Sequence, residues 1–130
     1  MGLFDKFKSQ REIAKEEIEE TPWHVLSTVA QLETLKEESK STPVVIFKHS
    51  TRCGISKMVL RQFENSYDLS DDQIKLYFLD LLKYREVSNQ IATEFGIPHE
   101  SPQLIVLKNG AAVHNDSHHS ISADHLRQFV

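Results

Sequence analysis

The sequence predicts an α/β fold in which a mixed central β-sheet is flanked by helices. Residues 44–47 form a continuous apolar run, Val-Val-Ile-Phe, which is typical of a central strand covered on both faces. Strand-like and helix-like segments alternate around this run, and such βαβ units form parallel strand pairs through right-handed crossovers. Nearer the C-terminus, Asn109-Gly110 is the turn signal of an antiparallel hairpin. These three observations predict a sheet that contains both parallel and antiparallel strands.

The composition is that of a globular domain. The chain has 130 residues, which suits one domain with one hydrophobic core, and 39% of them are hydrophobic and 26% charged. The formal net charge of −4 argues against a nucleic-acid-binding protein that relies on positive charge. No apolar run approaches the ~18 residues that span a bilayer, and no signal-peptide pattern is seen, so we expect no membrane association. A single cysteine rules out an intramolecular disulfide and favours a reducing, cytoplasmic compartment.

Residues 1–21 are expected to be an extension ahead of the folded domain, which we place at residues 22–130. A thin apolar stripe among Lys and Glu residues, and many helix-forming residues, predict a helical or partly ordered segment. The same stripe makes this extension a candidate for weak docking on a partner protein.

The first half of the domain is expected to contain two strands and two helices. Ser27 is predicted to cap the first helix, and Ser50 and Thr51 are capping residue types at the start of the second. Residues 41–43, Ser-Thr-Pro, separate the first helix from the central strand. We expect these elements at residues 22–26 (strand), 28–40 (helix), 44–47 (strand) and from about 50 to 65 (helix).

The second half is expected to add three strands and two helices. Alternation of apolar and polar residues predicts the third strand, and Asp80 near its end is read as a loop residue rather than a catalytic base. Gly96 is a suitable stop for the helix before it, and Ser122 a suitable cap for the last helix. We expect a strand at 74–82, a helix at 84–95, a loop at 97–102, strands at 103–107 and 111–114, a polar loop at 115–120 and a helix at 123–129.

Cys53, the only cysteine, falls in the first turn of the predicted helix that follows the central strand. A helix N-terminus offers unpaired N–H groups and a partial positive charge, and both stabilise a thiolate. Nearby cations stabilise it further. Candidate cations nearby in sequence are Lys48, His49, Arg52 and Lys57. Because its neighbours are polar rather than apolar, we expect Cys53 to be a reactive thiol and not a small buried hydrophobic residue.

The residues around Cys53 predict what such a thiol can do. Gly54 leaves room for a bulky partner, and Ser56, one turn further on, is placed to donate a hydrogen bond to the sulfur. Thiol–disulfide exchange passes through a mixed disulfide, and without a second cysteine the reaction stops there until another thiol arrives. We therefore expect a carrier of a small thiol rather than a dithiol reductase. Lys48 and Arg52 are candidate partners for carboxylates of that ligand.

The seven histidines do not show the pattern of a zinc site. No pair has the i, i+4 spacing on a predicted helix, and the side chains of the adjacent His118 and His119 would point apart in an extended segment. The sequence therefore predicts no metal site.

The order of elements, with a cysteine at a strand–helix junction and Ser101-Pro102 just before a hairpin, resembles the thioredoxin fold. In that superfamily the proline before the hairpin is cis and lies against the active-site sulfur. The resemblance implies that Pro102 is this proline, and that the backbone of Ser101 pairs with an extended, peptide-like thiol ligand.

More narrowly, the chain resembles the bacilliredoxin family of the YtxJ type, from about residue 21 to residue 130. Three segments carry this resemblance: residues 47–56 (FKHSTRCGIS), 100–103 (ESPQ) and 117–122 (SHHSIS). It implies an enzyme that removes bacillithiol from mixed disulfides on protein cysteines, acts without a further cofactor, and is expected to be a monomer. The implied catalytic residues are Cys53 and Ser56, and the implied ligand-binding residues are Lys48, Thr51, Arg52, Gly54, Ser101, Pro102 and His118.

Two alternatives stay open. The run Cys53-Gly54-Ile55-Ser56 is close to the Cys-Gly-Phe-Ser of monothiol glutaredoxins, which hold an iron–sulfur cluster with glutathione, whereas the bacilliredoxin family often has Pro after the cysteine. Against a cluster-binding module, this chain has Ser117-His118-His119 where a Gly-Gly-Cys-Asp-like stretch would follow the hairpin. The other alternative is a catalytically silent interaction domain that uses the N-terminal extension.

Overall fold

The computed structural model describes residues 21–130, so nearly all of the expected N-terminal extension lies outside the described residues. The elements follow the expected order of strands and helices. They are β1 (Trp23–Val25), α2 (Gln31–Glu38), β2 (Val44–His49), α3 (Gly54–Ser66), β3 (Lys75–Asp80), α4 (Arg85–Phe95), β4 (Gln103–Lys108), β5 (Ala111–Ser117) and the 3-10 helices η1 (His118–Ser120) and η2 (Ala123–Phe129).

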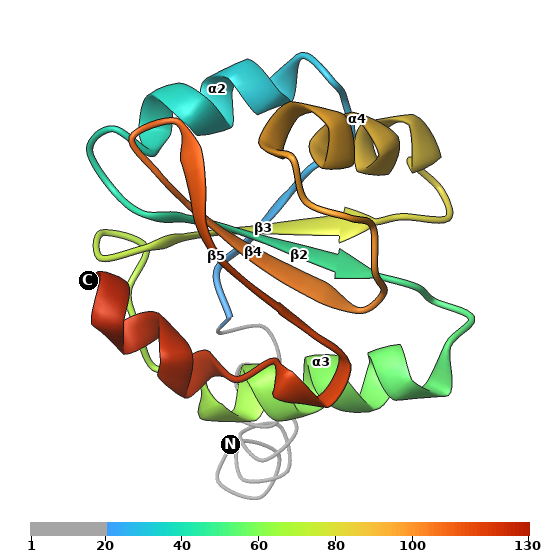
Figure 1. Cartoon of the computed structure of the whole chain (residues 1–130). Coiled ribbons are helices and arrows are strands. Elements are labelled where there is room, and N and C mark those ends of the chain that lie inside the picture. Colours follow the sequence, from blue (N-terminus) through green and yellow to red (C-terminus); the bar gives the residue numbers. More distant parts are fainter. Residues whose placement is uncertain (1–20) are drawn as a thin grey trace, which may run out of the picture.

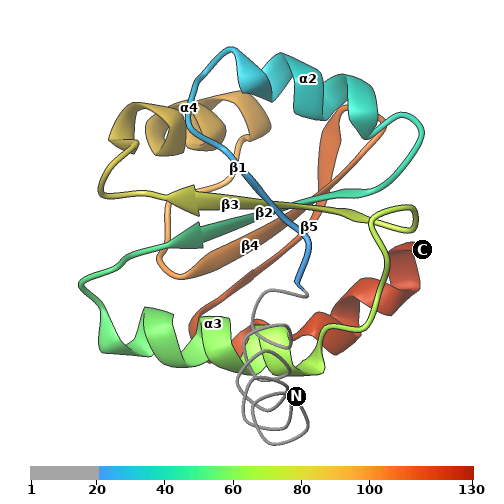
Figure 2. The same ribbon diagram turned by 180° about the vertical axis from the view of Figure 1, so that it is seen from behind.

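The five strands form one sheet in the order β1-β3-β2-β4-β5. The β1, β3 and β2 strands are parallel, and β4 and β5 are antiparallel to their neighbours. Helices α2 and α4 cover one face of the sheet, while α3 and η2 cover the other (Figure 1; Figure 2 shows the reverse side). The predicted α/β fold with a mixed sheet is confirmed.

The central strand β2 separates two hydrophobic cores. All six of its residues are buried. Val44 and Ile46 point into the core beneath α2 and α4, while Val45 and Phe47 point into the core beneath α3 and η2. A run that is apolar at every position is therefore explained by burial on both faces, as the sequence predicted.

Several element boundaries differ from the expected ones. Helix α3 begins at Gly54, because residues 50–52 form a turn closed by a hydrogen bond from the Cys53 amide to the Ser50 carbonyl (3.2 Å). Helix α2 begins at Gln31, after a turn closed by its own side chain, which accepts a hydrogen bond from the Ser27 amide (2.7 Å). Strand β5 continues to Ser117, through residues expected to be a loop, because it pairs with β4 as far as Gln103.

Over residues 21–130 no helix combines the length and the apolar character that crossing a bilayer requires.

Phe63 on α3 should be a major contributor to stability. Its ring centroid lies 5.4 Å from that of Phe47 and 5.7 Å from that of Trp23, in the core beneath α3. We expect Phe63→Ala to lower the free energy of unfolding by about 3–5 kcal/mol, measured by urea denaturation, because the cavity left by a large core side chain is only partly filled.

Met58, on the exposed side of the same helix, is the matched control. Met58→Ala should change the free energy of unfolding by about 0.5 kcal/mol or less. Equal losses in the two variants would contradict the assignment of Phe63 to the core.

Candidate active site

Cys53 is the N-cap residue of α3, with extended backbone torsions (φ −100°, ψ 120°). Its carbonyl accepts the first hydrogen bond of the helix, from the Lys57 amide (3.1 Å). The residue is partly exposed, and it is a free cysteine. The start of this 13-residue helix carries unpaired N–H groups and the positive end of the helix dipole, and the exposed cations Arg52 and Lys57 are adjacent to Cys53 in sequence or one turn on.

Space is open around the start of the helix. Thr51, Arg52 and Gly54 are all exposed, and a Cβ added at Gly54 would meet nothing within 4 Å. Packing among the described residues therefore does not require a glycine at position 54. The missing side chain does leave more room for a ligand to approach Cys53.

Ser56 is fully buried below the turn that precedes Cys53. Its hydroxyl oxygen accepts a hydrogen bond from the Ser50 amide (3.2 Å), so it ties the turn to the first turn of α3. The structure gives this hydroxyl a backbone partner, whereas the sequence suggested that it donates to the Cys53 sulfur. Ser56 acts on the thiol at least indirectly, by fixing the turn that carries it.

Lys48 does not reach the surface, contrary to the expectation that it meets a ligand carboxylate. The whole residue is buried at the end of β2, on the side of α2 and α4. Its ammonium Nζ lies 2.6 Å from His99 Nδ1 and donates a hydrogen bond to Gln103 Oε1 (3.0 Å). Burial lowers the pKa of Lys48 to about 8, an effect that the negative charge of Glu100 partly offsets.

Gln103 links Lys48 to the loop that leads into β4. Its Oε1 also accepts from the Glu100 amide (3.5 Å), and its Nε2 donates to the Pro98 carbonyl (3.1 Å). Burial and the charge of Lys48 lower the pKa of His99, so the neutral imidazole can accept a hydrogen bond at Nδ1. Lys48, His99 and Gln103 therefore form a polar clamp that fixes loop 97–102.

The Ser101–Pro102 peptide bond is cis, as the resemblance implied. Lys48 and Gln103 are opposite each other in the β2–β4 register, so the turn before Cys53 and the loop before Pro102 leave the same end of the sheet. The Pro102 carbonyl accepts a hydrogen bond from the His118 amide (3.0 Å), which brings the start of η1 to this loop. The fold thus gathers Cys53, Pro102 and His118 at one end of the sheet, with the His118 side chain exposed.

His49 is a buried neutral base rather than the cation suggested by its place in the sequence. Burial lowers its pKa, with the Lys57 charge acting in the same direction and Asp80 opposing both. Its ring lies beside that of Phe78, tilted by 40° and with 5.3 Å between centroids, and no described residue is a hydrogen-bond partner of its Nδ1. Asp80, opposite His49, is the last residue of β3 rather than a loop residue, and its carboxylate accepts from the Leu82 and Lys83 amides in the turn that follows.

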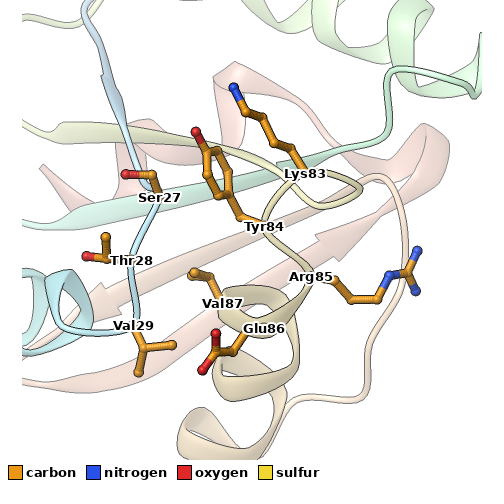
Figure 3. Close-up of a pocket in the computed structure, with 8 residues that line it drawn as sticks. All are labelled: Ser27, Thr28, Val29, Lys83, Tyr84, Arg85, Glu86 and Val87. Carbon is orange, nitrogen blue, oxygen red and sulfur yellow. The ribbon is translucent and has the colours of Figure 1, made fainter.

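A hollow of about 310 Å³ lies away from these residues, between the β1–α2 connection and the start of α4. Figure 3 shows its lining side chains, which come from residues 27–29 and 83–87. None of them belongs to the predicted set around Cys53, so we do not assign this hollow to the site.

Sequence reasoning missed His99 and Gln103. The sequence did contain a signal, because Lys48 and Gln103 are polar residues within strands that are otherwise mostly apolar. A buried polar side chain requires a partner, and the partner of each is the other.

The clamp predicts a measurable loosening of loop 97–102 when Gln103 is replaced. Gln103→Leu removes the acceptor of Lys48 and both contacts to the loop, so the free energy of unfolding should fall by about 1–3 kcal/mol. Hydrogen exchange at the Glu100 amide should become faster. Gln103→Glu keeps the acceptor but cannot donate to the Pro98 carbonyl, so its effect should be intermediate. Unchanged exchange at Glu100 in Gln103→Leu would contradict the clamp.

Comparison with known proteins identifies this arrangement. The family model described as monothiol bacilliredoxin BrxC matches residues 24–126. A solved structure described as a proposed oxidoreductase with a thioredoxin fold shares 33% identity, with a TM-score of 0.71 over 84% of this chain and 94% of that one. Thioredoxin from Malassezia sympodialis shares 26% identity, with a TM-score of 0.60 over 80% of this chain and 84% of that one.

A more distant neighbour supports the fold alone. The reduced thioredoxin pre-protein of Schistosoma mansoni has a TM-score of 0.64 at 24% identity, over 85% of this chain and all of that one. Because the family model spans most of the described domain and includes Cys53, the chain belongs to the monothiol bacilliredoxin BrxC family and is a thiol–disulfide oxidoreductase with the thioredoxin fold.

Proposed function

We propose that this enzyme removes bacillithiol from mixed disulfides on protein cysteines, in a reducing compartment such as the cytoplasm. The observation that carries the proposal is the position of Cys53, a free and partly exposed thiol at the N-cap of α3 and the only cysteine of the chain. The family match favours thiol exchange over cluster binding, because the family it names is a bacilliredoxin and not a monothiol glutaredoxin.

The first step is an exchange with no net oxidation. The Cys53 thiolate attacks the bacillithiol sulfur of the mixed disulfide, a new S–S bond forms between Cys53 and bacillithiol, and the protein cysteine leaves as a thiolate. The nucleophile belongs to the N-cap residue of α3, with Arg52 and Lys57 adjacent in sequence or one turn on. Because Cys53 replaces the target cysteine as the disulfide partner of bacillithiol, the target cysteine is restored to its reduced form.

The second step requires a thiol from outside this chain. Ser56 stands where a resolving cysteine would stand in a Cys-X-X-Cys motif, so no internal disulfide can release bacillithiol. A second low-mass thiol, or the thiol of another protein, must attack the Cys53 adduct and take bacillithiol away as a disulfide. No metal or organic cofactor takes part in either step as we propose it.

The residues around the site divide into ligand contacts and supports. We propose that Thr51, Arg52, Gly54 and the exposed His118 contact the bound thiol, and that the Ser101 backbone beside Pro102 pairs with an extended substrate. Lys48 supports the site through the clamp and does not touch the ligand.

The outer side of α3 offers a surface for the protein substrate. A hollow of about 350 Å³ there is lined by Lys57, Met58, Arg61, Gln62 and Asn65. It begins one turn beyond Cys53 and combines two cations with an exposed methionine. We propose that chain flanking the modified cysteine lies along this surface.

Adduct formation tests the proposal directly. Incubation with bacillithiol disulfide should add one bacillithiol per chain by intact-protein mass spectrometry, and Cys53→Ser should take up none. The enzyme, but not Cys53→Ser, should also release bacillithiol from a modified model protein when a reducing thiol is supplied. Glutathione disulfide in parallel tests the identity of the small thiol, because equal rates with both would contradict a bacillithiol-specific enzyme.

A second prediction tests the role assigned to the missing cysteine. Ser56→Cys creates a dithiol at Cys-X-X-Cys spacing, so the bacillithiol adduct should collapse to an intramolecular disulfide that is two mass units lighter than the reduced chain. Ser56→Ala, the matched control, should keep the adduct. An adduct of equal lifetime in Ser56→Cys and the unaltered enzyme would show that this position does not face the mixed disulfide.

A further inference from the structure

Three potential metal ligands converge on the edge of the sheet, at a place that the thiol chemistry does not use. His114 and Asp116 project from β5, and His125 projects from η2. One ligand atom from each residue lies within 4.8 Å of the other two. None of the three side chains has a role in the thiol exchange described above.

The carboxylate of Asp116 is the centre of this cluster. Its Oδ2 lies 2.8 Å from His114 Nε2 and 3.0 Å from His125 Nδ1, and the side chain is only 13% exposed. The β4–β5 register pairs His114 with Val106 and Asp116 with Leu104, both of which point into the core beneath α3 and η2. The two β5 ligands therefore lie on the face of the sheet that η2 covers, where His125 meets them.

Contacts within the protein restrict the two histidines of the cluster before any ligand arrives. The His125 amide donates to the Ser122 carbonyl (3.2 Å), and the His125 carbonyl accepts from Gln128 Nε2 (3.0 Å). The ring of His114 packs beside Phe129, with 5.3 Å between centroids. A ligand that binds here has little conformational entropy left to remove from the protein.

We propose that His114 Nε2, Asp116 Oδ2 and His125 Nδ1 bind a divalent first-row transition-metal ion, for which zinc is the best match. Two imidazoles and one carboxylate, with water in the fourth position, are a recognised zinc donor set. Zinc–ligand bonds of about 2.0–2.1 Å place tetrahedral ligands about 3.3 Å apart, so the two short contacts need to open by only a few tenths of an ångström. Magnesium and calcium prefer sets made of oxygen, so imidazole nitrogens argue against them.

Bound zinc would link the C-terminal helix η2 to the edge strand β5. Within the described part of the chain, strand β5 has a hydrogen-bonded neighbour on one side only, and η2 is joined to it here through side chains. Beyond Asp116 the same strand leads to His118, whose amide holds the Pro102 carbonyl. The metal would therefore stabilise a strand that borders the thiol site without touching Cys53. An ion that binds only the native state raises stability by mass action.

The test uses the full-length chain carrying Cys53→Ser, so that the thiol cannot supply a zinc ligand. After metal removal, equilibrium dialysis against zinc chloride should give one zinc ion per chain. Changes outside the ligand shell already weaken metal sites by about 10–100-fold, so Asp116→Asn or His125→Ala in this background should weaken binding by at least about tenfold. Zinc should also raise the melting temperature of the Cys53→Ser chain but not that of these variants.

His24→Ala in the same background is the matched control. His24 Nε2 lies 2.8 Å from the Asp71 carboxylate and the side chain is 43% exposed, close to the 47% of His125, but no third ligand from residues 21–130 joins this pair. Its zinc affinity should equal that of the Cys53→Ser chain. The proposal is overturned if that chain binds no zinc, if Asp116→Asn binds as tightly as its parent, or if His24→Ala weakens binding as much as His125→Ala. Far-UV circular dichroism checks that each variant is folded.

Discussion

The burial of β2 on both faces determines where chemistry can occur in this protein. Its backbone pairs with β3 on one side and β4 on the other, and its side chains fill two cores. Functional groups can reach solvent only where the strand ends, and α3 must begin close to that end because Val59 and Phe63 pack against Val45 and Phe47. The partial exposure of Cys53 and its place at a helix N-terminus both follow from this packing.

The same burial explains why a lysine is retained inside the domain. A charged group in the interior carries a desolvation cost, which shows in the lowered pKa of Lys48. Gln103 and His99 offset that cost with two acceptors, and the three groups connect the end of β2 to loop 97–102. A hydrophobic residue at position 48 would avoid the cost but would leave Gln103 without the donor that orients it. Lys48 therefore helps to fix the geometry of the loop before Pro102.

The sequence predicted those features that depend on local pattern. The apolar run of β2, the Asn109-Gly110 hairpin and the Gly96 helix end each contain their own signal, and the structure has all three, with Asn109 and both glycines at positive φ. The cis Pro102 was available only through resemblance. Features that depend on the tertiary fold were not available: the burial of Lys48, its pairing with His99, and the His114, Asp116 and His125 cluster. That cluster was hidden because β5 was expected to end at residue 114, which removed Asp116 from the alternation of the strand.

A single thiol also makes the exchange reversible. Exchange between Cys53 and the mixed disulfide of a protein with a small thiol conserves one S–S bond, so its equilibrium depends on the relative stabilities of the two disulfides and of the two thiolates. A dithiol enzyme would escape this balance by closing its own disulfide, but the only cysteine here is Cys53 and the position three residues on is Ser56. The loaded enzyme must therefore pass the small thiol to whichever external thiol is most abundant or best placed. When reduced small thiols are in excess, mass action favours removal of the small thiol from proteins. When small-molecule disulfides accumulate, mass action drives the same exchange in the opposite direction.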